Sequence, residues 1–159
     1  AGVVSLDSAS PMRQAFKDAR SNYYSGNGHY TAVRIPQAHK YGKILSKIRS
    51  GQVNQQHVVK LETKCLKAVR DLDKGVATVK DTLEALQEYE GIYGGKSKWP
   101  AISRTLSEKP WQKCSCPVCK EVGVEVIIFR GANRNKRRGF HNLWYTQKLL
   151  NSYKSELEE

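Results

Sequence analysis

The sequence has no long apolar run. No stretch approaches the roughly 18 consecutive apolar residues that a membrane helix requires, and the first residues do not resemble a signal peptide. We therefore expect a soluble, cytosolic protein that has no membrane partner. The chain also lacks an initiating methionine, because it begins with Ala1 and continues at once into a strand-like segment. Such a start is expected of an excised piece or a processed product of a longer protein.

Acidic residues are scarce. The chain has 15 Asp and Glu against 27 Lys and Arg, which gives a formal net charge of +12. The excess lies in two flanks: residues 1–60 hold nine basic and two acidic residues, and residues 94–140 hold eleven and three. Between them, residues 61–93 are nearly neutral. Such flanks favour binding to the phosphate backbone of a nucleic acid, although a basic surface that serves only solubility is the alternative.

Cysteine is also rare, yet three of the four cysteines, Cys114, Cys116 and Cys119, lie within six residues. Three thiols so close together would leave one unpaired in any disulfide scheme, so a metal explains them better. Tetrahedral zinc needs a fourth ligand, for which His141 is the best-placed candidate. We expect a structural zinc site, since four protein ligands leave no open position for the catalytic alternative. Cys65 stands apart on an apolar helical face and is predicted to be a buried thiol.

A helical hairpin is predicted at about residues 54–93. Apolar side chains recur there at three- and four-residue spacing, which places them on one face of a helix. Gly75 is the expected end of the first helix. Thr78, followed three residues later by Asp81, resembles a capping box that begins the second.

Short strands are predicted on both sides of this hairpin. Residues 2–6 form a β-prone run that ends in turn formers, which places Asp7 at the tip of a strand. Residues 28–35 and the apolar run 124–129 are the other predicted strands, and a final helix is predicted to begin at Asn142. The 39% of hydrophobic residues allow only a modest core, so the chain is one small domain or several short pieces that lean on a larger body.

Two motifs carry a resemblance to a known family. The C-x-C-x-x-C motif at 114–119 is followed, 22 positions after its last cysteine, by His141-Asn142, and this pattern resembles the tRNA-guanine transglycosylase superfamily. Residues 2–13, GVVSLDSASPMR, are similar to the segment in which the eighth barrel strand of that family delivers its nucleophilic aspartate. The resemblance implies that Asp7 is the nucleophile and that Arg13 contacts nucleic acid. From the residues alone, a turn cap is the more typical role for Asp7.

Two further features resemble the DNA-modifying branch of the superfamily, which inserts 7-deazaguanine bases. Asp7 and Cys114 are 107 positions apart, a long insertion filled by the hairpin, and residues 129–142 resemble a basic stretch of that branch. The resemblance implies a DNA substrate and a 7-deazaguanine base, with tRNA as the alternative.

The fold implied by the resemblance is α/β: the C-terminal fragment of a (β/α)8 barrel, consisting of its last strand and helix, with an inserted helical hairpin and a zinc-binding subdomain. Residues 1–36 would hold the last barrel strand, the nucleophile loop and a following strand, 37–95 the helical insertion, 96–141 the zinc-binding subdomain, and 142–159 the C-terminal barrel helix. An N-terminal barrel portion or a partner subunit would supply the rest, without which this chain is expected to be inactive. The resemblance also allows a homodimer.

The implied reaction is base exchange. Asp7 would attack the anomeric carbon of the sugar, forming a covalent glycosyl-enzyme as guanine leaves, and the incoming base would then displace Asp7. A stacked base must be extruded first, and backbone contacts would hold the distorted strand. The competing hypothesis is a non-catalytic, zinc-stapled module that binds nucleic acid. The candidate phosphate-binding residues are Arg13, Lys17, Arg20, Arg34, Arg130, Arg134, Lys136, Arg137 and Arg138.

Overall fold

The computed structural model describes residues 9–17 and 20–158, and the part it describes is mostly helical. The strand predicted at residues 2–6 and the candidate nucleophile Asp7 lie outside these residues. The elements, in chain order, are α1 (Ala9–Ala15), β1 (Val33–Arg34), α2 (Gly42–Arg49), α3 (Gln55–Asp73), α4 (Val79–Tyr93), α5 (Trp99–Glu108), α6 (Pro110–Lys113), α7 (Pro117–Val122), the 3-10 helix η1 (Gly123–Ile127), β2 (Ile128–Phe129) and α8 (Gly131–Glu158).

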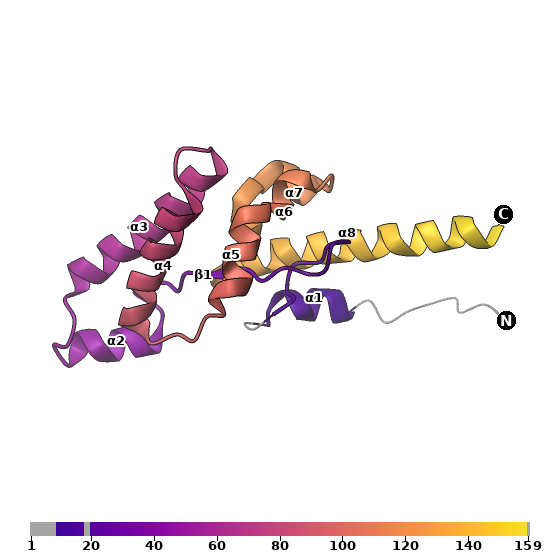
Figure 1. Cartoon of the computed structure of the whole chain (residues 1–159). Coiled ribbons are helices and arrows are strands. Elements are labelled where there is room, and N and C mark those ends of the chain that lie inside the picture. The colour runs from indigo at the N-terminus through magenta and orange to yellow at the C-terminus, as the bar shows by residue number, and fades with distance from the viewer. Residues whose placement is uncertain (1–8, 18–19, 159) are drawn as a thin grey trace.

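The predicted helical hairpin is confirmed as α3 and α4, which pack side by side (Figure 1). The Asn54 side chain accepts a hydrogen bond from the backbone of His57 and caps α3, and the chain reverses at Gly75, which has a φ of 74°. Thr78 accepts from the backbone N–H of Asp81 and caps α4, as the sequence predicts. The apolar stripes of the two helices are buried against each other, including Val58, Leu61, Cys65, Val69, Leu72, Ala85, Leu86, Tyr89 and Tyr93.

The predicted strands at 28–35 and 124–129 are much shorter in the structure. β1 and β2 form a two-stranded parallel sheet, in which Val33 pairs with Ile128 and Arg34 with Phe129. Gly123–Ile127 is a 3-10 helix, so a strand over the whole of 124–129 was a wrong prediction. The run is nevertheless buried, and a short apolar run is compatible with either structure because burial alone does not set its period.

The last helix begins at Gly131, not at the predicted Asn142. The first turns of α8 are buried through a polar stripe, in which Asn135, Arg138 and Asn142 recur at three- and four-residue spacing and are each at most 6% exposed. Because this stripe contains no apolar residue, its helical period does not register as hydrophobic periodicity.

Helix α1 lies along the first half of α8, and the second half of α8 extends beyond the body of the molecule (Figure 1). The contact is close because α8 carries Gly139 there: a Cβ at this position would lie 2.1 Å from Sδ of Met12 in α1. Helices α5, α6 and α7 lie between the α3–α4 hairpin and α8. None of the described helices is long and apolar enough to cross a membrane.

Candidate metal centre

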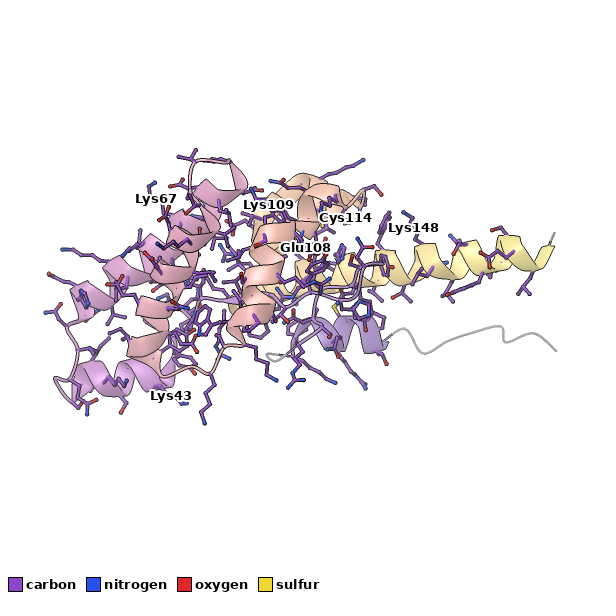
Figure 2. The ribbon with its side chains drawn as sticks, in the orientation of Figure 1. Lys43, Lys67, Glu108, Lys109, Cys114 and Lys148 are labelled. Atoms are coloured by element: carbon purple, nitrogen blue, oxygen red, sulfur yellow. The ribbon has the colours of Figure 1, made fainter. Side chains whose placement is uncertain are left out.

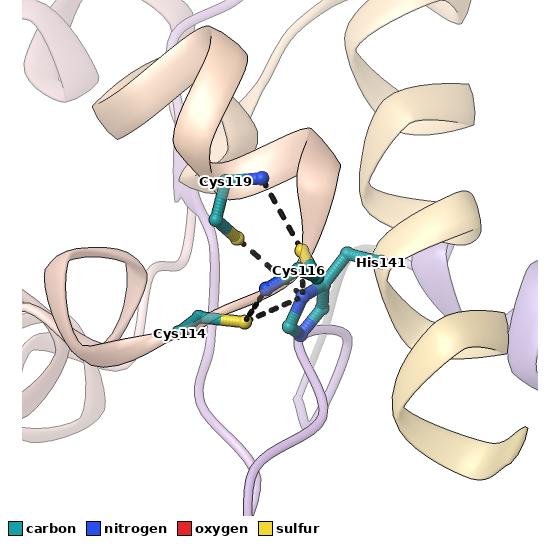
Figure 3. A group of neighbouring side chains, drawn as sticks. All are labelled: Cys114, Cys116, Cys119 and His141. Carbon is teal, nitrogen blue, oxygen red and sulfur yellow. Dashed lines mark hydrogen bonds between the residues drawn. The ribbon is translucent and has the colours of Figure 1, made fainter. Parts of the chain in front are cut away.

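Four candidate ligands from three elements meet at one point. Cys114 follows α6, Cys116 and Cys119 come from the first turn of α7, and His141 comes from α8 (Figure 3). Their ligand atoms all lie within 4.8 Å of one another, and Nδ1 of His141 lies 3.3–3.5 Å from the three sulfurs. The structure therefore brings the four predicted ligands together.

The geometry fits a tetrahedral metal ion. Bonds of about 2.3 Å to sulfur and about 2.0–2.1 Å to nitrogen place each sulfur roughly 3.6 Å from the nitrogen, close to the distances in this cluster. Three sulfurs and one imidazole are ligands that suit zinc. The cluster could thus hold a metal ion with all four positions occupied by protein.

The backbone of α7 sets the positions of the sulfurs. Pro117 is the first residue of the helix, where its missing N–H costs nothing, and Cys116 is the N-cap. The backbone N–H of Cys119 points at Sγ of Cys116, 3.2 Å away, and the N–H of Cys116 points at Sγ of Cys114. These donors stabilise negative charge on sulfur, which a bound metal requires.

His141 is held with Nδ1 facing the sulfurs. Its Nε2 lies 2.9 Å from the carbonyl oxygen of Tyr24, so Nε2 carries the proton and donates it there. This leaves the lone pair of Nδ1 free for a metal, an arrangement typical of metal-binding histidines. The ring of Tyr23 stacks on the imidazole with centroids 3.9 Å apart. Nothing in the sequence points to Tyr23 or Tyr24, because neither shares a motif with the cysteines.

Tyr23 also contacts the cluster through its hydroxyl, which lies 3.3 Å from Sγ of Cys119. Burial, followed by the charge of Cys119, raises the pKa of Tyr23 well above its ordinary value. The hydroxyl therefore stays protonated and donates to the sulfur.

The thiols influence one another's ionisation. Hydrogen bonds from Cys116 and Cys119 lower the pKa of Cys114, whereas the hydrogen bond with Cys114 raises the pKa of Cys119. Burial lowers the pKa of His141, but its hydrogen bonds with Cys114 and Cys116 outweigh this and raise the pKa to about 9. A proton on the imidazole and a divalent cation thus compete for the same place between the sulfurs.

Asn142, the residue after the histidine, ties the metal centre to the N-terminal segment. Its Oδ1 accepts from the backbone N–H of Tyr24 at 2.9 Å, and its Nδ2 donates to the carbonyls of Pro11 and Asn22, each at 3.1 Å. The side chain is fully buried. Asn142 and His141 therefore clamp α1 and residues 22–24 against α8.

Three of the candidate phosphate-binding arginines already have partners within the chain. Arg138 is fully buried and donates to the carbonyls of Val126, Ile128 and Ala15, so its charge does not face solvent. Arg130 pairs with Glu62, and both side chains are only 10% exposed.

Arg134 lies 2.8 Å from Glu125, which also accepts from Arg70 at 2.6 Å. Burial raises the pKa of Glu125, but the hydrogen bonds from Arg70 and Arg134 outweigh it and leave the pKa below its ordinary value.

The other candidates lie at the surface. Arg34 is half-buried, with its guanidinium over the rings of Tyr41 and Phe129. The exposed candidates are near or on the α1–α8 pair: Arg13, Lys17, Arg20, Lys136 and Arg137.

Comparison with known proteins supports the resemblance noted in the sequence. No family model matches the chain. Over 147 residues it is 43% identical to a DNA-guanine transglycosylase from Salmonella montevideo, an alignment that covers 89% of this chain and 35% of the relative. The chain therefore spans about a third of the length of the curated relative that it matches, and the predicted similarity to the DNA-modifying branch is confirmed.

Proposed function

We propose that this chain is part of a transglycosylase that exchanges guanine in DNA for a 7-deazaguanine base. The observation that carries the proposal is its similarity, along most of its length, to a DNA-guanine transglycosylase. The four-ligand cluster supports it, because the same residues carry the family motif in the sequence.

The chain would form the C-terminal part of a (β/α)8 barrel. In this proposal residues 1–36 supply the last strand and the nucleophile loop, 37–95 the helical insertion, 96–141 the metal-binding subdomain and 142–159 the C-terminal barrel helix. An N-terminal portion or a partner subunit would supply the remaining strands. The small share of the relative that the chain spans is consistent with this division.

Asp7 would be the nucleophile. Its carboxylate forms a bond to the anomeric carbon of the deoxyribose, the bond to guanine breaks, and guanine leaves with the bonding electron pair and takes up a proton. The incoming 7-deazaguanine then loses its ring N–H proton, attacks the same carbon and releases Asp7 as carboxylate. Each step replaces one bond at the anomeric carbon by another, so no water is consumed.

The contacts around α1 support this role. The helix begins two positions after Asp7, and three contacts with α8 hold it. Asn142 and Arg138 donate to the backbone carbonyls of Pro11 and Ala15, and the side chain of Met12 packs against Gly139. A nucleophile must be kept within a fraction of an ångström of its productive position, and such support is what keeps it there.

The metal would be structural zinc. Bound to Cys114, Cys116, Cys119 and Nδ1 of His141, it would supply no open coordination position and would act by cross-linking α7 to α8. The clamp from His141 and Asn142 would pass this rigidity on to α1 and residues 22–24.

The exposed cations near α1 and α8 would contact the DNA backbone beside the extruded nucleotide. Arg13 and Lys17 end the α1 segment, Arg20 follows it, and Lys136 and Arg137 lie on the α8 turns nearby. Arg34 is close to a surface cavity. We assign Arg130, Arg134 and Arg138 to holding this face, because their guanidiniums bind groups of the chain itself.

The test is a base-exchange assay on the native protein together with the portion or subunit that supplies the barrel. We expect labelled 7-deazaguanine to enter DNA, and a covalent protein–DNA adduct to be trapped at Asp7 by acid quench and mass spectrometry. Asp7→Asn should abolish both while leaving DNA binding and zinc content unchanged. Glu84→Gln, an exposed carboxylate on α4, is the matched control.

Each other outcome changes the proposal. Full exchange by Asp7→Asn would remove Asp7 from the chemistry, and incorporation into tRNA but not DNA would replace the substrate. Absence of exchange with every barrel portion tried, with nucleic-acid binding retained, would favour the non-catalytic binding module.

A further inference from the structure

A second cationic surface lies away from the metal centre, at the start of α2 and in the loop between α4 and α5. A cavity of about 290 Å³ is lined there by residues that include Arg34, Tyr41, Lys43, Lys96 and Lys98. An adjoining cavity of about 170 Å³ shares Arg34 and Tyr41 and adds Lys40. We call the two together the α2–α5 groove. Figure 2 shows Lys43 on α2, at the lower left of the view, away from Cys114 and from Lys148 on α8.

Within the part of the chain that the structure describes, the lysines of the α2–α5 groove have no acidic partner. Lys40, Lys43, Lys96 and Lys98 are all exposed, and within residues 9–17 and 20–158 no carboxylate forms an ion pair with any of them. Elsewhere on the surface, lysines such as Lys64 and Lys67 do pair with acids. Like charges gathered without counter-charges repel one another, so a bound polyanion would relieve the repulsion.

The loop that carries Lys96 and Lys98 is held against α4 by a hydrogen bond and by close packing. Oε1 of Glu90, a side chain that is only 7% exposed, accepts a hydrogen bond from the backbone N–H of Ser97 at 2.6 Å. The chain passes so close to α4 that a Cβ on Gly95 would lie 2.4 Å from the ring of Tyr93 and 2.9 Å from Oε1 of Glu90. Lys96 and Lys98, on either side of Ser97, therefore extend from a backbone that is held in place, and their side chains lie in solvent.

The shape of the groove favours an extended ligand over a single phosphate. Its two cavities meet at Arg34 and Tyr41, where the guanidinium lies 5.3 Å from the tyrosine ring centroid. Lys40 lines the smaller cavity, and Lys43, Lys96 and Lys98 line the larger one. A row of cations interleaved with an aromatic ring is what a sugar–phosphate backbone requires.

We propose that the α2–α5 groove binds the phosphodiester backbone of the DNA substrate at a distance from the reacting nucleotide. The proposal rests on the proposed function for the identity of the strand, and it assigns Lys40, Lys43, Lys96 and Lys98 to successive phosphates. These lysines lie in the helical insertion and its exit loop, so the insertion would extend the DNA-binding surface beyond the barrel.

The test is the salt dependence of DNA binding by the native, zinc-loaded protein. The probe is a fluorescently labelled 30-base-pair duplex, titrated at several salt concentrations between 50 and 200 mM. For Lys96→Ala/Lys98→Ala we expect the slope of log Kd against log salt to fall by about 1.8, because each phosphate contact contributes about 0.9. At about 0.1 M salt, affinity should drop by roughly 10- to 100-fold. Lys96→Arg/Lys98→Arg should restore both values.

Lys74→Ala/Lys80→Ala is the matched control, because it removes the same charge at the α3–α4 turn, the end of the hairpin farthest from α2 (Figure 1). Its slope should stay within about 0.5 of native. Equal changes in the two double variants would overturn the proposal, since only net charge would then matter, and an unchanged groove variant would overturn it as well. Melting curves for each variant establish that folding is intact.

The base-exchange assay separates this proposal from the proposed function. Lysine-dependent binding by a protein that exchanges no base would leave the groove in place and refute the transglycosylase. If the groove variant exchanged bases fully and bound DNA as the native protein does, the groove proposal would be refuted and the transglycosylase would remain.

Discussion

Replacing Asn142 with alanine tests the clamp between the metal centre and the N-terminal segment. The substitution removes three hydrogen bonds, one from the N–H of Tyr24 and two to the carbonyls of Pro11 and Asn22. Each is worth about 1 kcal/mol net, and the buried backbone groups left without partners add to the loss. We expect the free energy of unfolding to fall by about 3–4 kcal/mol, a large part of the roughly 5–15 kcal/mol that stabilises a typical domain.

The measurement is urea unfolding with zinc in excess, followed by circular dichroism. Asn142→Asp should lose about as much stability as the alanine variant, because a carboxylate accepts from Tyr24 but cannot donate to either carbonyl. Asn151→Ala is the control: Asn151 is exposed on the same helix and only accepts from Gln147, so its effect should stay within about 0.5 kcal/mol. A loss below about 1 kcal/mol for Asn142→Ala, or one equal to that of the control, would refute the clamp.

Three further predictions concern other parts of the molecule. Cys119→Ser should lower the zinc content of the purified protein from one per chain to near zero, measured by atomic absorption, because it removes a buried ligand. Glu125→Gln should lower the free energy of unfolding by about 1 kcal/mol at neutral pH and by nothing below about pH 4, measured by unfolding at several pH values. Because the pKa of Glu125 is lower in the folded than in the unfolded protein, its carboxylate stabilises the fold above the unfolded-state pKa, and this stability is lost as the carboxylate is protonated. Gly95→Ala should destabilise the protein by about 1–3 kcal/mol, because the added Cβ meets the ring of Tyr93. Gly91→Ala, at a position in α4 with open space around it, should stabilise the protein by about 0.5–1 kcal/mol. Equal melting temperatures for the two variants would contradict the packing at Gly95.

The hairpin and the metal ligands could be predicted because their signals are local. Apolar periodicity and the Thr78 cap define α3 and α4, and the spacing of the three cysteines points to a metal whatever the surrounding fold. The choice of His141 needed only its residue type and its place in the sequence, because the other histidines lie far upstream.

The rest depends on contacts that only the folded chain makes. The first turns of α8 are buried through Asn135, Arg138 and Asn142, whose partners are backbone carbonyls and leave no trace in composition. The 3-10 helix Gly123–Ile127 begins at a glycine with a φ of 55°, and its buried residues Val124, Val126 and Ile127 form an apolar run that hydrophobicity alone does not distinguish from a strand.

The second cationic surface was missed for a similar reason. Lys43 and Lys96 are far apart in the sequence, and neither stands in a basic run of the kind that suggests a phosphate contact. The fold brings them to one groove because α2 packs against α4, and the loop after α4 returns beside α2.

Hydrogen–deuterium exchange with and without zinc tests most directly whether the metal centre holds the segment next to the proposed nucleophile. On chelation of the metal, residues 9–17 and 20–24 should lose protection together with residues 114–142, while α3 and α4 keep theirs, because none of the four candidate ligands lies on the hairpin. Unchanged protection of residues 9–17 and 20–24 after complete removal of the metal would contradict the account.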